Sequence, residues 1–316
     1  MSPWPWEEPF LHAGLLVCAM LWDALLGEVP ARVHPVVGMG RTIRAWRDAA
    51  PRAGRIRRLF WGLLAALSLP AVAGLATWGA VQIPWAGPII GLFLLQASLA
   101  RRSLGEAGLR VGQAVARGDL AAGRDGLSWL CSRDPSNLDA EELSGAALES
   151  ISENASDSVV APLFWFVLLG VPGAVAYRCI NTADAMVGYR DRFEWLGKAA
   201  ARIDDIANVL PARITALTLL AAGVGTRSAS LRGGVTAMFR DARHTDSPNA
   251  GWPMATLAGL LGVRLSKRAQ YALHAEGRAP DGDDLILGWR IVNRACWLSA
   301  AAAVGGLLAA GIQGAT

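Results

Sequence analysis

Long apolar stretches alternate with polar stretches along this chain, and their lengths predict a helical membrane protein. Two of them, Leu59–Val81 and Ala295–Ile312, are long enough to cross a bilayer core of about 30 Å as single helices. Shorter apolar stretches lie at Phe10–Leu26 and Trp85–Ala100. A further one at 214–225 is too short to span and predicts a half-inserted helix.

One apolar stretch is broken in its middle. Val159–Ile180 contains the sequence Gly170-Val-Pro-Gly173, and proline with glycine breaks a helix. Each half has about ten residues, too few to cross a bilayer alone. We therefore predict a re-entrant helical hairpin whose two ends lie on the same side, with a single kinked spanning helix as the alternative.

The polar stretches predict helical elaborations on a single membrane domain. They cover about 28–58, 101–158 and 226–294, and the apolar periodicity within the second indicates amphipathic helices. A turn is expected near Ser132–Ser136. The predicted fold class is an all-α, polytopic membrane protein, and residues 1–316 are expected to form one domain.

Composition supports a membrane location and argues against a nucleic-acid partner. Hydrophobic residues make up 53% of the chain, charged residues 18%, and the mean hydropathy is +0.32. The net charge of +4 comes from a local excess at Arg32–Arg58, where eight Arg accompany one Asp. Such a cluster beside an apolar stretch predicts a cytoplasmic loop. The four cysteines form no CxxC pair, so neither a disulfide framework nor a zinc site is expected.

Acidic residues at helical spacing are the most informative polar feature. Glu149, Glu153 and Asp157 follow each other at i, i+4 and i+8, with Asn154 among them, directly before an apolar stretch. Like charges at this spacing repel, and burying them near a membrane is costly. A divalent cation or a cationic ligand would offset that cost. The alternative is a solvated acidic face before a membrane helix.

Two further clusters combine carboxylates with amides. Asn181 and Asp184 share a helix face at i, i+3. Asp204 and Asp205 stand four and three residues before Asn208. Oxygen ligands of this kind suit Mg²⁺, which often bridges to phosphate oxygens.

Basic residues and a polar turn near these clusters predict phosphate binding. Arg202 and Arg213 flank the third cluster and offer bidentate phosphate contacts, unless they form structural ion pairs with the neighbouring aspartates. Ser247 and Asn249 lie in a tight turn that can present backbone N–H groups to an anion. His244, just before this turn, is a candidate acid or base, or a surface group.

Five motifs, in this order, resemble those of the adenosylcobinamide-phosphate synthase family of cobalamin biosynthesis. The matching stretches are Asp23-Ala-Leu-Leu-Gly-Glu-Val-Pro with His34-Pro-Val, Glu149-Ser-Ile-Ser-Glu-Asn-Ala-Ser-Asp, Tyr177-Arg-Cys-Ile-Asn-Thr-Ala-Asp-Ala-Met-Val-Gly-Tyr, Ala201-Arg-Ile-Asp-Asp with Asn208-Val-Leu-Pro-Ala-Arg, and Ser247-Pro-Asn-Ala-Gly. One motif alone would be weak, but five in register are specific.

The resemblance implies an integral membrane ligase of late corrinoid assembly. Such an enzyme uses ATP to join adenosylcobyric acid to (R)-1-aminopropan-2-ol phosphate, an aminoalcohol phosphate, through a new amide bond. The carboxylate must be activated, most simply as an acyl phosphate, and Mg²⁺ would neutralise phosphate charge. The expected partners are the corrinoid substrate, the aminoalcohol phosphate, the lipid bilayer and other late cobalamin-assembly enzymes. The expected location is the bacterial inner membrane, in several passes, with a cytoplasmic active site.

The predicted roles of individual residues are our inference from the residue types. Catalytic roles are expected for Glu149, Glu153, Asp184 and His244. Substrate or phosphate contacts are expected for Asn154, Asn181, Arg202, Asn208, Arg213, Ser247, Asn249 and His34, the last of which is otherwise a packed interfacial histidine. Metal contacts are expected for Glu153, Asp157, Asp184, Asp204 and Asp205, all in one Mg²⁺–phosphate site.

Two other function classes fit parts of the pattern. A membrane Mg²⁺-dependent prenyl- or CDP-alcohol phosphotransferase would also carry carboxylates on facing helices, but the chain has neither DxxxD nor DDxxD. A transporter would suit a re-entrant hairpin, but inverted repeats are not evident.

Overall fold

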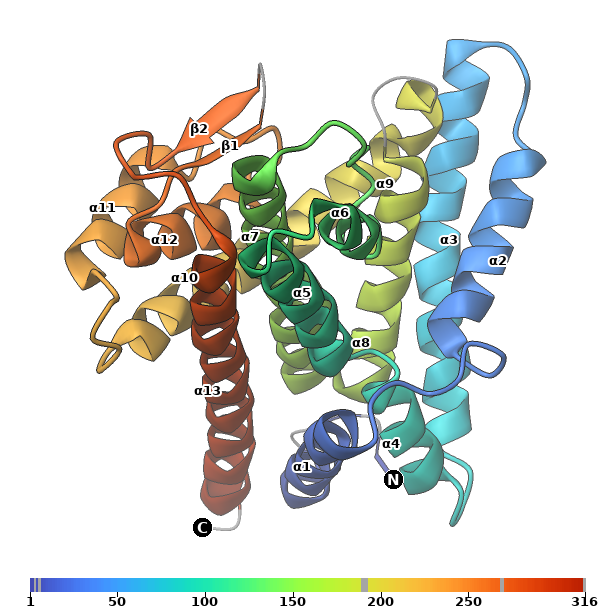
Figure 1. Ribbon diagram of the computed structural model, residues 1–316. Coiled ribbons are helices and arrows are strands. Elements are labelled where there is room, and N and C mark those ends of the chain that lie inside the picture. The colour runs from blue at the N-terminus through green and yellow to red at the C-terminus, as the bar shows by residue number, and fades with distance from the viewer. Residues whose placement is uncertain (3, 5–6, 189–192, 268–269, 315–316) are drawn as a thin grey trace. The chain divides into compact units, whose positions relative to one another are not determined.

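A computed structural model describes residues 1–2, 4, 7–188, 193–267 and 270–314 of the chain. The described residues are almost wholly helical, with one small sheet (Figure 1). The chain divides into two compact units. Unit 1 comprises Met1–Ala100, Ala161–Asn208 and Ala300–Thr316, and unit 2 comprises Arg101–Val160 and Val209–Ser299.

Unit 1 is built from helices only in the part of it that the structure describes. These are α1 (Pro9–Leu25), α2 (Pro35–Asp48), α3 (Arg55–Val81), α4 (Gly87–Gln96), α8 (Ala161–Val187), α9 (Glu194–Ala207) and the C-terminal part of α13 (Gly282–Gly314).

Unit 2 combines helices with a two-stranded antiparallel sheet. Its elements are α5 (Arg101–Ala116), α6 (Leu120–Ser128), α7 (Ala140–Ala155), the π-helical turn η1 (Ser156–Val160), α10 (Val209–Gly223), α11 (Leu231–Asp241), α12 (Gly251–Leu261), β1 (Leu265–Lys267), β2 (Tyr271–Leu273) and the N-terminal part of α13.

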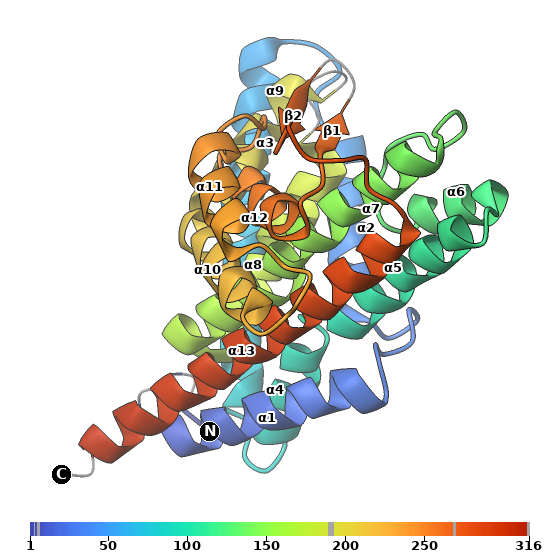
Figure 2. The same cartoon turned by 60° about the vertical axis from the view of Figure 1, so that its left-hand side comes forward.

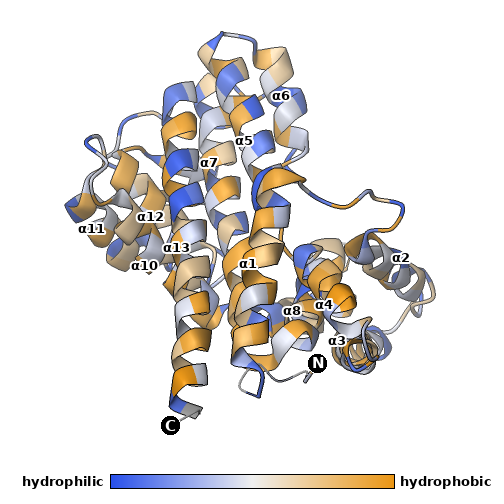
Figure 3. Ribbon diagram, turned by 90° about the horizontal axis from the view of Figure 1, so that it is seen from below, coloured by the Kyte–Doolittle hydropathy of each residue, from blue (hydrophilic) through white to orange (hydrophobic). Residues whose placement is uncertain are grey.

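The long apolar helices confirm the predicted polytopic, all-α fold. Among the described residues, α3 and α13 are long and apolar enough to cross a bilayer, and the stretch Ala140–Val187 passes the same test of length and composition although its chain is broken at Gly170. The bent pair of α9 and α10 adds a fourth span if it is counted as one helix. Apolar residues also cover much of α1 and α4, as Figure 3 shows. The protein is therefore a membrane protein with several spans.

The helix ends follow local sequence signals. α2 begins with Pro35 at its first position, after His34, whose ring nitrogen Nδ1 accepts a hydrogen bond from the Val36 N–H at 3.2 Å. α7 begins with a reciprocal capping box between Asp139 and Glu142. The predicted turn at Ser132–Ser136 is confirmed as a non-helical segment before that cap.

The predicted hairpin is present within α8. Gly170 has φ 67° and ψ −160°, a conformation outside the helical region that suits glycine. A Cβ atom on Gly173 would lie 2.5 Å from the carbonyl oxygen of Trp165, although eight residues of straight helix would separate them by about 12 Å. Ala161 likewise packs in one cluster with Tyr177. The chain therefore reverses at Gly170, and the alternative of one kinked spanning helix is wrong.

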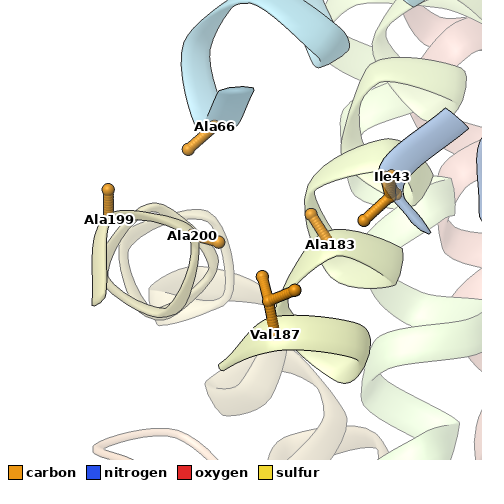
Figure 4. Close-up of a cluster of buried hydrophobic side chains, with 6 residues drawn as sticks. All are labelled: Ile43, Ala66, Ala183, Val187, Ala199 and Ala200. Atoms are coloured by element: carbon orange, nitrogen blue, oxygen red, sulfur yellow. The ribbon is translucent and has the colours of Figure 1, made fainter. Parts of the chain in front are cut away.

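The second arm of the hairpin packs against α2, α3 and α9 in unit 1. In Figure 1 this arm runs beside α3, and Figure 4 shows the buried side chains that join the four helices. The cluster consists of Ile43, Ala66, Ala183, Val187, Ala199 and Ala200. Because five of these six side chains are Ala or Val, the helix backbones approach closely. This packing holds the second arm of α8, which carries Asp184, in place against its neighbours.

Unit 2 is organised around α12. Nearly every residue of α12 is buried, and it contacts α7, α10, α11 and both strands. Figure 2 shows α11 and α12 side by side. The sheet pairs Leu265 with Leu273 and Lys267 with Tyr271. These strands and the π-helical turn η1 leave no periodic pattern in the sequence, and such π-helical irregularities are frequent at functional sites.

Candidate functional site

In unit 1, a buried carboxylate is held by an amide and a phenol. Asn208 Nδ2 donates to Asp204 Oδ2 at 3.0 Å, and the Tyr177 hydroxyl donates to Asn208 Oδ1 at 2.8 Å. Asp204 is 9% exposed, Asn208 2% and Tyr177 1%. The phenol therefore fixes the orientation of the Asn208 amide, whose NH₂ group then faces the carboxylate.

Asn181, from the second arm of α8, also contacts the Asp204 carboxylate. The Asn181 side chain hydrogen-bonds to Asp204, and Arg178 Nη1 donates to Asn181 Oδ1 at 3.2 Å. Arg178 also lies close to His34. Burial lowers the pKa of His34, and Arg178 lowers it further while Glu28 opposes the change. His34 is thus a neutral N-cap at the edge of this group of residues.

Asp184 stands beside this group and supplies a second carboxylate. Its charge acts on Asp204, and the charge of Asp205 acts on both. The Asp184 side chain lies over Gly188, where a Cβ atom would come within 2.1 Å of Asp184 Oδ1. Only glycine leaves room for the carboxylate there. The half-buried Asp205 accepts from the exposed Arg202 at 3.5 Å, so the predicted alternative of a structural ion pair applies to Arg202.

These carboxylates fit a divalent cation that also binds phosphate oxygens. Asp204 Oδ1 is buried and has no hydrogen-bond partner among the described residues. The amides of Asn181 and Asn208 carry no positive charge, so they do not neutralise the adjacent carboxylates of Asp184 and Asp204. Within the described residues, no set of three His, Cys, Asp or Glu side chains is arranged to hold a metal by itself. Mg²⁺ commonly takes one or two carboxylates and completes its shell with phosphate and water, which Asp184 and Asp204 would allow.

In unit 2, Glu149 occupies a comparable buried position but has a cationic partner. Arg133 Nη2 donates to Glu149 Oε2 at 2.7 Å, and the Glu149 side chain is 6% exposed. Tyr271 and Lys267, from the small sheet, also act on Glu149. Burial holds the pKa of the Tyr271 phenol far above its ordinary value, and the charges of Glu149 and Glu153 add to the shift. Glu149 and Glu153 therefore lie together, as their spacing predicted.

The other predicted residues of this segment have local partners. Asn154 Nδ2 donates to the Ser150 carbonyl oxygen at 2.9 Å, back along its own helix. Asp157 is half-buried in the π-helical turn, so it is not on a regular α-helical face with Glu149 and Glu153. The expected i+8 position of Asp157 in one continuous α-helix is wrong, because η1 inserts a wider turn before it.

Arg213 and the turn after His244 are brought together in unit 2. Arg213 Nη1 donates to Asn249 Oδ1 at 2.6 Å, and its guanidinium lies 4.5 Å from the centre of the Trp252 ring. Within the turn, Ser247 Oγ accepts from the Asn249 N–H at 3.2 Å. The side chain of His244 is 54% exposed, with its Nδ1 3.8 Å from Asp241. The structure thus places Arg213 in contact with this turn, and the phosphate that they would bind stays a prediction.

The predicted site residues thus form two groups, one in each unit. Asn181, Asp184, Asp204, Asp205 and Asn208 lie in unit 1, and Glu149, Glu153, Asp157, Arg213 and Asn249 lie in unit 2. The single Mg²⁺–phosphate site that we expected from all the carboxylates stays a prediction. Tyr189, which ends the third motif, lies outside the described residues.

Four partners of these residues were not singled out from the sequence. They are Tyr177, Arg133, Trp252 and Tyr271. Tyr177 precedes Asn181 by one helical turn, which is a usable signal because both then share a face. The other three gave no local signal, since Arg133 lies in a turn and Tyr271 is more than a hundred residues from Glu149.

Comparison with known proteins gives one consistent result. The family described as CobD/Cbib protein matches residues 16–299. The chain is 42% identical over 299 residues to a cobalamin biosynthesis protein CobD of Chromobacterium violaceum, which covers 90% of this chain and 94% of the relative. It is 38% identical to the corresponding protein of Dehalococcoides mccartyi, covering 86% and 87%. A protein of Methanothermobacter thermautotrophicus described as a probable cobalamin biosynthesis protein CobD is 38% identical over 298 residues, covering 94% of this chain and 98% of the relative. No solved structure matches the chain.

Proposed function

The chain belongs to the CobD/CbiB family of ligases, which form adenosylcobinamide phosphate from adenosylcobyric acid and aminopropanol phosphate, and we propose that ATP and Mg²⁺ drive this reaction at the Asp184–Asp204 carboxylates. Family membership removes the phosphotransferase and transporter alternatives. The proposal rests mainly on the surroundings of Asp204. This residue is a buried carboxylate beside a second one, with amide partners and one unused oxygen.

The proposed chemistry has two steps. The γ-phosphoryl group of ATP is transferred to a carboxylate oxygen of adenosylcobyric acid, and ADP leaves. The amine of aminopropanol phosphate then attacks the acyl carbon, phosphate leaves with the carboxylate oxygen, and the amine loses a proton. Mg²⁺, when bound, would neutralise charge on the phosphate oxygens.

Each group of side chains has a proposed task in this scheme. Asp184 and Asp204 hold the cation, with Asp205 adding negative charge, while Asn181 and Asn208 orient Asp204. Arg213 and the Ser247–Asn249 turn bind the donor phosphate. We assign proton removal from the amine to Glu153, a half-buried carboxylate whose charge acts on Tyr271 together with that of Glu149. His244 is exposed and is the less suitable base.

The proposed orientation places the ATP site in the cytoplasm of a bacterial cell. The Arg-rich stretch at 32–58 supports a cytoplasmic location for the turn between α2 and α3. ATP is available on that side of the inner membrane. Other late cobalamin-assembly enzymes are proposed as neighbours there, since the product is a pathway intermediate.

The direct test is an assay with the purified, detergent-solubilised full chain. Adenosylcobyric acid, aminopropanol phosphate, ATP and Mg²⁺ should give adenosylcobinamide phosphate, with one ATP consumed per product. Omitting ATP or adding EDTA should each abolish product formation. Product formation without nucleotide would remove ATP from the scheme, and full activity in EDTA would remove the metal.

Arg213 is tested through its choice of donor. Arg213→Lys keeps the charge but loses the planar fork, so KM for aminopropanol phosphate should rise about tenfold. KM for unphosphorylated aminopropanol should change little, and Arg227→Lys, on an exposed loop, should change neither. Equal effects of Arg213→Lys on both donors would assign Arg213 to the nucleotide, the corrinoid or the fold.

A further inference from the structure

Unit 1 has a charged surface that is not used by the proposed reaction. It consists of exposed arginines at the C-terminal half of α2, in the following turn and at the start of α3, and we call it the basic surface: Arg41, Arg44, Arg52, Arg55 and Arg57. The one acidic residue in this stretch, Asp48, is engaged by Arg47 at 2.8 Å. The first turn of α3 contains no acidic residue. Within the described part of α2, the following turn and the start of α3, the basic residues therefore far outnumber the acidic ones.

The length of α3 places this surface at the edge of the bilayer. α3 has 27 residues and is about 40 Å long, whereas a bilayer core is about 30 Å thick. Only 17% of the residues in its most apolar part are buried within the protein, so one side of the helix is open to lipid. Exposed apolar side chains begin at Phe60 and continue through Leu63, Leu64 and Leu67. The arginines before Phe60 then lie at the depth of the lipid headgroups.

Two tryptophans hold the basic surface in place. Trp46 Nε1 donates to the Trp61 carbonyl oxygen at 3.3 Å, and Trp61 Nε1 donates to the Trp46 carbonyl oxygen at 3.1 Å. Their rings lie 4.7 Å apart, so they join α2 to α3. Tryptophan is also the residue type that favours the membrane interface. A rigid, arginine-rich surface at this depth is complementary to a layer of negative charge.

We propose that the basic surface binds the headgroups of anionic phospholipids in preference to zwitterionic ones. Guanidinium groups pair with lipid phosphates in two-pronged hydrogen bonds, and each basic residue near an anionic leaflet adds about fivefold to binding. A zwitterionic headgroup offers the same phosphate without net charge. Anionic lipid bound to α2 and α3 also stabilises the folded chain, because it binds the folded state alone.

The test measures lipid preference on the full chain in neutral detergent. Phosphatidylglycerol or phosphatidylcholine is titrated, and bound lipid is counted by native mass spectrometry while the melting temperature is recorded. The wild type should bind phosphatidylglycerol at least about tenfold more tightly. The triple variant Arg44→Gln, Arg52→Gln, Arg57→Gln should bind the two lipids within about threefold of each other. Raising the salt concentration should narrow the preference of the wild type.

Matched variants separate this surface from net charge. Arg110→Gln, Arg117→Gln, Arg227→Gln removes three exposed arginines from unit 2 and should leave the preference intact. The charge-conserving triple variant Arg44→Lys, Arg52→Lys, Arg57→Lys should keep most of the wild-type preference for phosphatidylglycerol. If the Gln triple variant fails to fold, Arg52→Gln alone should reduce the preference about fivefold. No preference in the wild type, or an equal loss in the control triple, would overturn the proposal.

Discussion

Asp204 of unit 1 and Glu149 of unit 2 are both buried carboxylates, but their hydrogen-bond partners differ in charge. They are 9% and 5% exposed, and each has one buried oxygen without a hydrogen-bond partner among the described residues. The other oxygen of Glu149 accepts from Arg133 at 2.7 Å, whereas that of Asp204 accepts from the amide of Asn208 at 3.0 Å. An amide provides hydrogen bonds but no positive charge.

We interpret this difference as one between a carboxylate that stabilises the fold and a carboxylate that the proposed reaction uses to bind a cation. A buried charge is costly unless it is paired. Glu149 is largely neutralised within the protein. Among the described residues, Asp204 has Asp184 beside it and amides as its hydrogen-bond partners, and we expect a bound cation to supply the positive charge. Ionisable residues in such surroundings are typical of functional sites.

The largest expected effect is on stability, and it is confined to unit 2. Glu149→Gln leaves the Arg133 charge without its partner and should lower the free energy of unfolding by about 3 kcal/mol. Differential scanning fluorimetry in detergent would show this as a fall in Tm. The double variant Arg133→Gln, Glu149→Gln should lose less than the sum of the single changes. By contrast, Asp204→Asn relieves repulsion with Asp184 and should leave Tm unchanged or higher. Similar losses of Tm in both single variants would erase the distinction between the two carboxylates.

A smaller effect, on Mg²⁺ binding, is expected when Asn208 loses the hydrogen bond that fixes its orientation. Tyr177→Phe removes the hydroxyl that donates to Asn208, a loss of about 1 kcal/mol that should raise the half-saturating Mg²⁺ concentration about fivefold. At saturating Mg²⁺, kcat should recover most of its wild-type value. Trp165→Phe is the matched control, because it removes a hydrogen bond to the Ala207 carbonyl oxygen in the same cluster. It should lower Tm without changing the Mg²⁺ dependence. A Tyr177→Phe enzyme with unchanged Mg²⁺ dependence would show that the phenol only packs.

The smallest expected effect is a pH dependence from His34. Because burial holds the pKa of His34 below the ordinary value of about 6.5, the unfolded chain binds this proton more readily than the folded chain. Stability should therefore fall as the pH drops through that value, by up to about 1 kcal/mol for a lost N-cap. His34→Asn keeps a capping acceptor without a titrating group. Its Tm should fall less than that of the wild type between pH 7.5 and 5.5, and parallel pH profiles would rule out this role.

Hydropathy predicted the membrane helices because apolar length is a local property. The reversal in α8 was also predictable, since Gly170-Val-Pro-Gly173 interrupts a stretch too short for two spans. Helical spacing correctly grouped Glu149 with Glu153 and Asp204 with Asn208. The two three-residue strands and the π-helical turn were missed, because they are too short to impose a periodic pattern on the sequence.

The charge balance of the site could not be predicted from the sequence. Arg133, which neutralises Glu149, lies in a turn sixteen residues away, and no pattern links it to that glutamate rather than to another carboxylate. Arg202 is exposed beside Asp205 in the structure, and the phosphate contact expected of it stays a prediction. Which acidic residues keep their charge available depends on tertiary contacts, and this is what distinguishes Asp204 from Glu149.

The most direct test of a cation site at Asp184 and Asp204 is metal binding rather than turnover. Mn²⁺, used as a paramagnetic substitute for Mg²⁺, is titrated into the full chain in detergent with a non-hydrolysable ATP analogue, and free Mn²⁺ is followed by electron paramagnetic resonance. The wild type should bind one tight Mn²⁺ per chain beyond that held by the nucleotide alone. Asp204→Asn should weaken this binding at least about tenfold, whereas Asp48→Asn, on an aspartate with a 61% exposed side chain, should not. Unchanged Mn²⁺ affinity in Asp204→Asn would contradict the account.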